Sequence, residues 1–193
     1  IIALVPIAGL TQITPIYTIQ GSGNSSPLVS QTVTTEGVVF ADFQTSALLN
    51  GFFIQDTLGD GNPLTSDGVF VYAPSGMNVN VGDYVTVTGQ VLEYFDLTEI
   101  GNVSNITING TITNMIAPTP ITLPVTSVSM YEAHEGMYVT FPQNLVVTDN
   151  YNLGKYGEFT LAVDRQFIPT EVVDPNDDPA SGTSYTGSSN VAE

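Results

Sequence analysis

The sequence contains no cysteine and no tryptophan, and only two of its residues are Lys or Arg. Without cysteine, neither disulfide bonds nor thiolate metal sites can form. Against the two basic residues stand 19 Asp and Glu residues, which gives a formal net charge of −17. Affinity for nucleic acids depends mainly on cationic side chains that neutralise phosphates. Direct nucleic-acid binding without a bridging metal ion is therefore disfavoured, because only Lys155 and Arg165 are available, with His134 as a weak third.

Long apolar runs are also missing, and no stretch is long enough to span a bilayer as a helix. The chain does not open with Met, and we expect Ile1 to be a processed or trimmed start. Charged residues make up only 11% of the chain, while Thr, Ser, Asn and Gly are abundant. This composition is typical of a secreted β-protein and predicts an extracellular location. A length of 193 residues favours one domain with extensions.

Short β-type runs separated by turn residues predict an all-β fold. Residues 31–43 and 83–95 are long runs rich in Val and Thr, with Gly37 and Gly89 near their centres. A glycine inside a strand often marks a bend or bulge where one strand serves two sheets. Two bent strands with the hairpin of residues 51–72 between them form the pattern of a small closed Greek-key barrel.

Local patterns add three expectations. Residues 15–20 form a short apolar run that predicts a strand. The pair Asn109-Gly110 predicts a two-residue hairpin turn. Residues 129–135 are the one helix candidate, one or two turns long, in which Ser129 and Glu132 match a capping box.

The loop inside residues 51–72 is rich in Asp and Gly. Its candidate metal ligands are Asp56, Asp60, Asn62 and Asp67. Calcium takes six to eight oxygen ligands from flexible loops, and Gly59, Gly61 and Gly68 let this backbone turn because glycine reaches positive φ without steric cost. A calcium site and a solvated acidic loop that binds nothing both fit this pattern, since EF-hand spacing is absent. A second candidate calcium site in the tail uses Asp174, Asn176, Asp177 and Asp178.

Residues 1–10, IIALVPIAGL, are almost wholly apolar, and Pro6 argues against a helix. Three interpretations stay open: the end of a secretion signal, an edge strand of this domain, or a strand donated to a neighbouring copy. In a donated strand the contacting side chains would be those of Ile1, Ile2, Leu4, Val5, Ile7 and Leu10. Heterologous donation of this kind builds open filaments when its rotation does not close.

Several segments between about residues 15 and 173 resemble, in the same order, segments of a known protein family. They are IYTIQGSG (16–23), QTVTTEGVV (31–39), GFFIQDTLGDGNPLTSDGVFVY (51–72), VGD (81–83), EGM (135–137), VTFP (139–142) and DNYNLGKYGE (149–158). Together they resemble the OB-fold-like N-terminal region of secreted endonucleases of the ExeM/NucH type. The resemblance implies an OB-like Greek-key barrel over residues 15–173, with additional strands and one short helix. An apolar extension, residues 1–14, would precede it, and an acidic tail, residues 174–193, would follow.

In that family the phosphodiesterase chemistry belongs to a separate C-terminal domain, so we expect no catalytic residue in this chain. His134 is the lone histidine, which leaves metal-assisted hydrolysis with a His acid–base without a second partner. OB-folds that bind single strands stack bases on aromatic side chains in a basic groove. The candidate stacking residues are Tyr94, Phe95, Tyr151 and Tyr156, but the basic groove is missing.

Three functions remain open from the sequence. The first is a non-catalytic OB-fold module of a secreted nuclease-family protein, stabilised by calcium, that positions DNA or a C-terminal nuclease domain. The second is an extracellular structural subunit that assembles with other copies of itself into filaments through strand donation. The third is a carbohydrate-binding module, which would have to stack sugars on tyrosine because tryptophan is absent.

Overall fold

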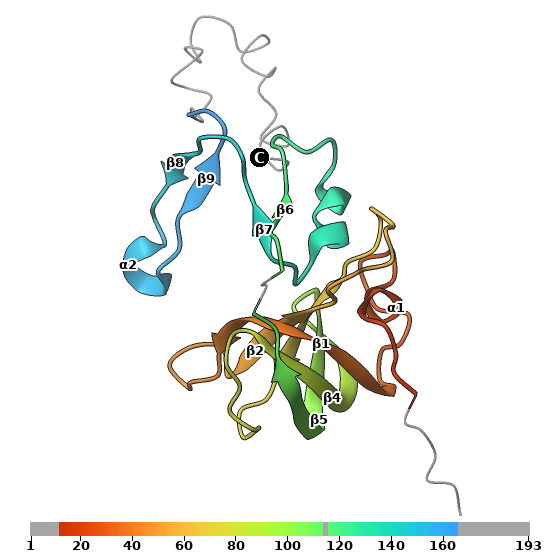
Figure 1. Cartoon of the computed structure of the whole chain (residues 1–193). Helices are drawn as coiled ribbons and strands as arrows, with labels where there is room; N and C mark the ends of the chain where they lie inside the picture. Colours follow the sequence, from red (N-terminus) through yellow and green to blue (C-terminus); the bar gives the residue numbers. More distant parts are fainter. Residues whose placement is uncertain (1–11, 114–115, 166–193) are drawn as a thin grey trace, which may run out of the picture. The chain divides into compact units, whose positions relative to one another are not determined.

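The computed structural model describes residues 12–113 and 116–165. These residues divide into two compact units (Figure 1). The first comprises the described residues up to Pro118 together with Tyr131–Tyr138, and the second comprises Thr119–Met130 together with residues 139–165. The expected domain of residues 15–173 thus includes residues of both units. Within the described ranges, no helix is long and apolar enough to cross a membrane.

Five strands of the first unit close into a barrel in the order β1-β2-β3-β5-β4. Their bounds are Thr32–Phe43 (β1), Gly51–Gln55 (β2), Gly68–Tyr72 (β3), Asp83–Tyr94 (β4) and Leu97–Thr111 (β5). Neighbouring strands run antiparallel, except that β3 and β5 pair in parallel. A closed Greek-key barrel of five strands is the OB type. The predicted all-β, OB-like fold is therefore confirmed.

The barrel core is built from alternate residues of β2 and β3. On β2, Phe52 and Ile54 are fully buried, and on β3 their direct partners Val71 and Val69 are fully buried as well. Successive side chains of a strand point to opposite faces. The residues between them, including Phe53, therefore lie on the outer face of the same two strands.

Residues 15–20, predicted as a strand, form the short helix α1 (Ile16–Gln20) instead. Pro15 caps the start with φ −58°, a value that proline imposes and that suits entry into a helix. Ile16 and Ile19, three residues apart, are both buried in the barrel core. The strand prediction was wrong because burial of one apolar helical face overrides the β propensity of Ile, Tyr and Thr.

Gly37 lies next to Val38, where β1 changes its pairing partner, and Gly89 lies at an irregularity of β4. β1 pairs with β4 up to Val38 and with β2 from Val38 onward, so one strand serves two neighbours. A Cβ on Gly37 would lie 3.0 Å from the carbonyl oxygen of Gln55. Gly89 lies at the register shift of β4 against β5. Both positions need a residue without a side chain because a neighbouring backbone approaches closely.

Gly68 has a different role from the one expected. Its φ is not positive, in contrast to those of Gly59 (60°) and Gly61 (70°). A Cβ on Gly68 would collide with the carbonyl oxygen of Gly136. Ser66 Oγ donates a 2.5 Å hydrogen bond to the neighbouring carbonyl of Glu135. The first residue of β3 is thus glycine because residues 131–138 pack directly against it.

Asn109-Gly110 is not a hairpin turn, because β5 continues along β4 as far as Thr111. Gly110, with φ 154°, lies at a register shift and forms a bulge. The β4–β5 hairpin turns instead at Phe95 and Asp96, with φ 51° and 63°. Positive φ at both central residues is the type I′ pattern, which Asn and Gly usually signal. The sequence conceals this turn because neither residue is Asn or Gly.

Residues 129–135, predicted as a helix, contribute to two 3₁₀ turns, η1 (Val128–Met130) and η2 (Glu132–His134). Ser129 lies inside η1, and its Oγ shares a 2.8 Å hydrogen bond with Ser127 Oγ, so it does not act as the N-cap of a helix. The second unit contains β6 (Thr119–Pro120) parallel to β7 (Val139–Thr140), β8 (Val146–Asp149) antiparallel to β9 (Thr160–Ala162), and α2 (Leu153–Tyr156). The helices and 3₁₀ turns among the described residues are all short, as expected for this class.

Candidate functional site

A row of four residues crosses the outer face of the barrel on four adjacent strands. Phe53 on β2 pairs with Phe70 on β3, Phe70 pairs with Glu99 on β5, and Glu99 pairs with Leu92 on β4. The Phe53 and Phe70 ring centroids are 4.8 Å apart at an interplanar angle of 47°. The row places one carboxylate at the end of an aromatic pair.

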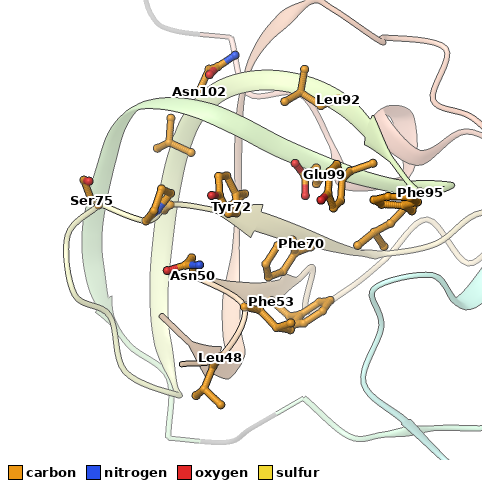
Figure 2. Close-up of a pocket in the computed structure, with 17 residues that line it drawn as sticks. Leu48, Asn50, Phe53, Phe70, Tyr72, Ser75, Leu92, Phe95, Glu99 and Asn102 are labelled. Carbon is orange, nitrogen blue, oxygen red and sulfur yellow. The ribbon is translucent and has the colours of Figure 1, made fainter. Parts of the chain in front are cut away.

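A cavity of about 910 Å³ opens over this row. We call it the outer cleft, and Figure 2 shows the side chains that line it. Besides the row, its walls include three aromatic side chains, Tyr72, Tyr94 and Phe95, and the aliphatic side chains of Leu48, Leu49, Leu97 and Val103. Asn50, Ala73, Pro74, Ser75, Gly76 and Asn102 complete the lining. The cleft is predominantly apolar, with few polar groups, as small-ligand and side-chain pockets generally are.

The loops that frame the outer cleft come from three places in the barrel, of which the β3–β4 connection supplies Ala73, Pro74, Ser75 and Gly76. Leu48, Leu49 and Asn50 belong to the β1–β2 connection, and Phe95 belongs to the β4–β5 turn. A loop that ends in Asn50 at φ 56° turns sharply into β2, and the Asn50 carbonyl accepts a 2.9 Å hydrogen bond from the Ala73 backbone. The walls of the cleft are therefore tied to the strands that form its floor.

Glu99 is the sole charged side chain among the lining residues. It is only 6% exposed, and no donor among the described residues hydrogen-bonds its carboxylate. Burial raises the pKa of the Glu99 carboxyl above its ordinary value, because a charge in apolar surroundings loses its hydration. Phe70 is the direct strand partner of Glu99, and Figure 2 shows both side chains in the cleft that Tyr72 and Phe95 also line.

Phe95 is held in an unusual conformation at the rim of the outer cleft. Its φ of 51° lies in the left-handed region, which costs an ordinary L-residue roughly 1–2 kcal/mol. Its ring is 88% exposed and packs edge-on against Tyr94, with centroids 4.7 Å apart. A strained, exposed aromatic residue beside a cavity is a candidate for function, because such strain persists where the site uses it.

Two of the four predicted stacking residues line this cleft, namely Tyr94 and Phe95. Tyr151 and Tyr156 belong to the second unit, are 90% and 58% exposed, and are not among the lining residues. Lys155 lies over the Tyr156 ring at 4.6 Å from its centroid. The structure thus brings together only one pair of the predicted stacking set.

The sequence interpretation missed Phe53, Phe70, Tyr72 and Glu99 as site residues. A signal was present, because residues 52–54 and 69–72 are apolar or aromatic at every position rather than at alternate ones. A strand of a half-exposed barrel needs apolar residues on its inner face alone. Apolar residues on the outer face as well indicate that this face is covered or binds something.

In the acidic loop between β2 and β3, side-chain oxygens accept hydrogen bonds from backbone N–H groups of the same loop. Asp56 Oδ1 accepts a 2.9 Å bond from the Leu58 backbone, and Asp60 Oδ1 accepts a 2.8 Å bond from the Asn62 backbone. Asn62 Oδ1 in turn accepts the Leu64 backbone N–H at 3.1 Å. Three of the four candidate ligands thus give an oxygen to the loop itself, and Asp60 gives both, because its Oδ2 accepts a 2.9 Å bond from Thr65 Oγ1.

Asp67 differs from the other candidate ligands, because its Oδ1 is buried and has no partner among the described residues. Burial raises the pKa of the Asp67 carboxyl, and the nearby charges of Asp60 and Asp56 raise it further, while a hydrogen bond from the Asp60 backbone opposes the shift. A cation between these carboxylates would relieve both costs. Within residues 12–113 and 116–165, however, no group of three or more His, Asp or Glu side chains is arranged to hold a metal ion.

Two sets of predicted residues lie outside the described ranges. The tail ligands Asp174, Asn176, Asp177 and Asp178 form one set. The apolar residues Ile1, Ile2, Leu4, Val5, Ile7 and Leu10 form the other. Both stay predictions of the sequence.

The strand order defines this chain as an OB-type barrel, and its outer cleft is aromatic and mostly apolar. No protein-family model matches the chain, and no curated protein matches it. Among solved structures, the chain is similar to one titled "Structure of the hypothetical protein ygiW from E. coli". The two share 19% sequence identity, the match covers 42% of this chain and 76% of that one, and the TM-score is 0.31. The fold class rests on the strand pairing of this chain and not on that similarity.

Proposed function

We propose that this chain is a non-catalytic OB-fold module of the secreted-nuclease type that binds a partner through the outer cleft. Calcium at the β2–β3 loop would stabilise it. The proposal keeps the extracellular location and the nuclease domain as partner that the resemblance implies. The outer cleft is the surface at which we expect the partner to bind.

The position of the outer cleft is the observation that carries the proposal. OB-folds bind their ligands on the face of strands 2 and 3, between the loop joining strands 1 and 2 and the loop joining strands 4 and 5. Here Phe53 and Phe70 form that face, while Leu49 and Phe95 come from those two loops. The cavity therefore occupies the place where this fold offers a binding surface.

The lining chemistry supports binding rather than catalysis. General acid–base catalysis needs a proton donor or acceptor within hydrogen-bond reach of the reacting group, and usually a second group that orients it. The outer cleft has Glu99 as its one carboxylate, and no His, Lys or Arg is among its lining residues. Large aromatic surfaces with few polar groups are instead typical of the centres of interfaces.

A binding experiment with matched variants tests this proposal. The full chain is titrated with a separately produced catalytic domain of an ExeM/NucH-type nuclease, and amide shifts are followed by NMR. We expect the shifts to cluster around the outer cleft, and Tyr94→Ala to weaken binding by about tenfold, as loss of an aromatic interface residue typically does. Tyr151→Ala, an exposed tyrosine of the second unit, is the control and should leave affinity unchanged. Equal affinity of both variants with wild type would exclude the cleft as the contact.

Self-assembly is the second candidate function, favoured by the apolar sequence of residues 1–10 together with an apolar cleft on the same chain. Light scattering with calcium and then with chelator separates the two functions. Particles far above 20.5 kDa that require calcium and residues 1–10 would support assembly. A monomer of 20.5 kDa, unchanged by calcium and by deletion of residues 1–10, would contradict it.

A further inference from the structure

One carboxylate in the outer cleft, that of Glu99, has no hydrogen-bond partner among the residues that the structure describes. Glu99 is more than nine-tenths buried, and the part that stays open lines the cavity. Its neighbour Glu93, by contrast, accepts hydrogen bonds from the Ser26 backbone at 2.7 Å and from Thr98 Oγ1 at 2.8 Å. Glu135 accepts one from the Thr98 backbone at 2.9 Å. Glu93 is only half satisfied, because its Oε2 is buried without a partner among the described residues. Glu99 differs from both neighbours in that no hydrogen bond from the described residues reaches either carboxylate oxygen and its side chain lines the cleft.

A buried carboxylate without a partner is costly, because the lost hydration is not replaced by hydrogen bonds or an opposite charge. An occupant that supplies a cation removes this cost, whereas a neutral or anionic occupant would bury the charge more deeply. The aromatic side chains around Glu99 favour the same sign of occupant, since the faces of Phe and Tyr rings attract cations. The charge of −17 on the whole chain also draws cationic partners toward it.

The remaining walls define the rest of the occupant. Leu48, Leu49, Leu92, Leu97 and Val103 offer aliphatic surface and no charge. A cavity of about 910 Å³ is larger than one Lys or Arg side chain needs. Apolar residues on either side of a basic residue would fill the remaining space and bury this surface.

We infer that the outer cleft recognises a basic side chain, Arg or Lys, flanked by apolar residues on a partner polypeptide, with Glu99 as its counter-charge. The inference deepens the proposed function by giving the chemistry of the partner, and it rests on that function. Arg fits better than Lys, because a planar guanidinium binds a carboxylate through two parallel hydrogen bonds and stacks on aromatic rings. The rings of Tyr94 and Phe95 stand at the rim, where such stacking would occur.

The test uses short peptides and the full chain. An acetylated and amidated Leu-Arg-Phe peptide is titrated into labelled protein and followed by NMR, beside a peptide in which neutral citrulline replaces Arg. We expect saturable shifts at the outer cleft for the Arg peptide, and binding weaker by about tenfold or more for the citrulline peptide, since a charge-assisted bond is about twice as strong as a neutral one. Arginine amide alone shows whether a small organic cation suffices or flanking apolar residues are needed.

Two variants locate the counter-charge. Glu99→Gln keeps the size of the side chain and removes its charge, so it should weaken the Arg peptide by about tenfold or more and leave the citrulline peptide nearly unchanged. Asp96→Asn removes one charge beside the cleft at a residue that does not line it, and should leave both affinities close to wild type. Circular dichroism checks that both variants are folded.

Three results would overturn the inference: no binding of the Arg peptide, equal binding of both peptides, or full affinity in Glu99→Gln. Other results distinguish the failure of this inference from the failure of the proposed function. If a nuclease domain, a neutral oligosaccharide or an oligonucleotide shifts the cleft residues while the Arg peptide does not, the cleft is a binding site of different chemistry. If the nuclease domain binds but leaves the cleft residues unshifted, the proposed binding surface itself is wrong.

Discussion

Phe70 and Glu99 are direct neighbours in the parallel pairing of β3 with β5, and both face the outer cleft. β3 and β5 are not consecutive in the chain, so the aromatic row and the buried carboxylate meet only in the folded barrel. The position of Glu99 thus follows from topology. The same contact buries the Glu99 carboxylate, and the burial of this charge lowers the stability of the fold.

The raised pKa of Glu99 predicts how stability changes with pH. A carboxyl whose pKa is higher in the folded than in the unfolded chain binds more protons when folded, so the free energy of unfolding falls as pH rises from about 4.5 through the folded-state pKa. Glu99→Gln removes this loss, and we expect the variant to be more stable than wild type at pH 8 but similar at pH 4. Urea unfolding at both pH values measures it.

Asp67 and Glu135 also have raised pKa values caused mainly by burial, so part of the pH slope should persist in Glu99→Gln. Glu158→Gln, at an exposed position of the second unit, is the control and should reproduce the wild-type slope. If the free energy of unfolding of Glu99→Gln changed with pH as that of wild type does, the Glu99 carboxylate would have to find a hydrogen-bond or ion-pair partner in solution.

Phe95 predicts a conflict between stability and binding. Asn tolerates the left-handed conformation that Phe95 adopts at φ 51°, so Phe95→Asn should stabilise the chain by about 1 kcal/mol. The same change removes an exposed ring from the rim of the outer cleft and should weaken any partner that stacks there. Urea unfolding and peptide titration measure the two effects. A variant that is less stable than wild type would show that the ring packs more strongly than its conformation strains it.

The parts of the fold that could be predicted are those with local signals. Strand β4 alternates with period two, and β1 is recognisable by its Val and Thr content, because both signals need only neighbouring residues. Helix α1 was missed because Ile16 and Ile19 become a buried pair only once a barrel exists to receive them.

The candidate site was only partly predictable for the same reason. Tyr94 and Phe95 could be named as aromatic residues near a turn, but the type I′ turn itself carries neither Asn nor Gly. Glu99 is an ordinary acidic residue in the sequence, and its importance comes from Phe70 on a strand that is distant in the chain. A non-local parallel pairing of this kind leaves no periodic trace in either strand.

Gly51 predicts how tightly the aromatic row is packed. A Cβ at this position would lie 2.5 Å from Cζ of Phe70 and would collide with the carbonyl oxygen of Val71. Gly51→Ala should therefore displace the Phe70 ring and destabilise the chain by about 1–3 kcal/mol, the usual cost of overpacking. Gly23→Ala is the matched control, because a Cβ there meets nothing within 4 Å. Equal unfolding midpoints for the two variants would contradict the packing of this row.

Asp67 predicts opposite effects of one substitution with and without calcium. If calcium binds the β2–β3 loop, wild type should be stabilised by about 2.7 kcal/mol at a calcium concentration near 100 times Kd. Asp67→Asn should lose most of that gain, because it replaces the carboxylate whose Oδ1 is buried and unpaired. In chelator the same variant should be more stable than wild type at pH 7, because the raised pKa of Asp67 means that its charged form destabilises the metal-free fold. Thermal unfolding of wild type and Asp67→Asn, each in calcium and in chelator, measures these stabilities, with Asp96→Asn as the charge control.

A wild type whose stability does not change with calcium would exclude the site. If Asp67→Asn is stabilised by calcium as much as wild type is, calcium binds other ligands, of which the tail residues Asp174, Asn176, Asp177 and Asp178 are the next candidates.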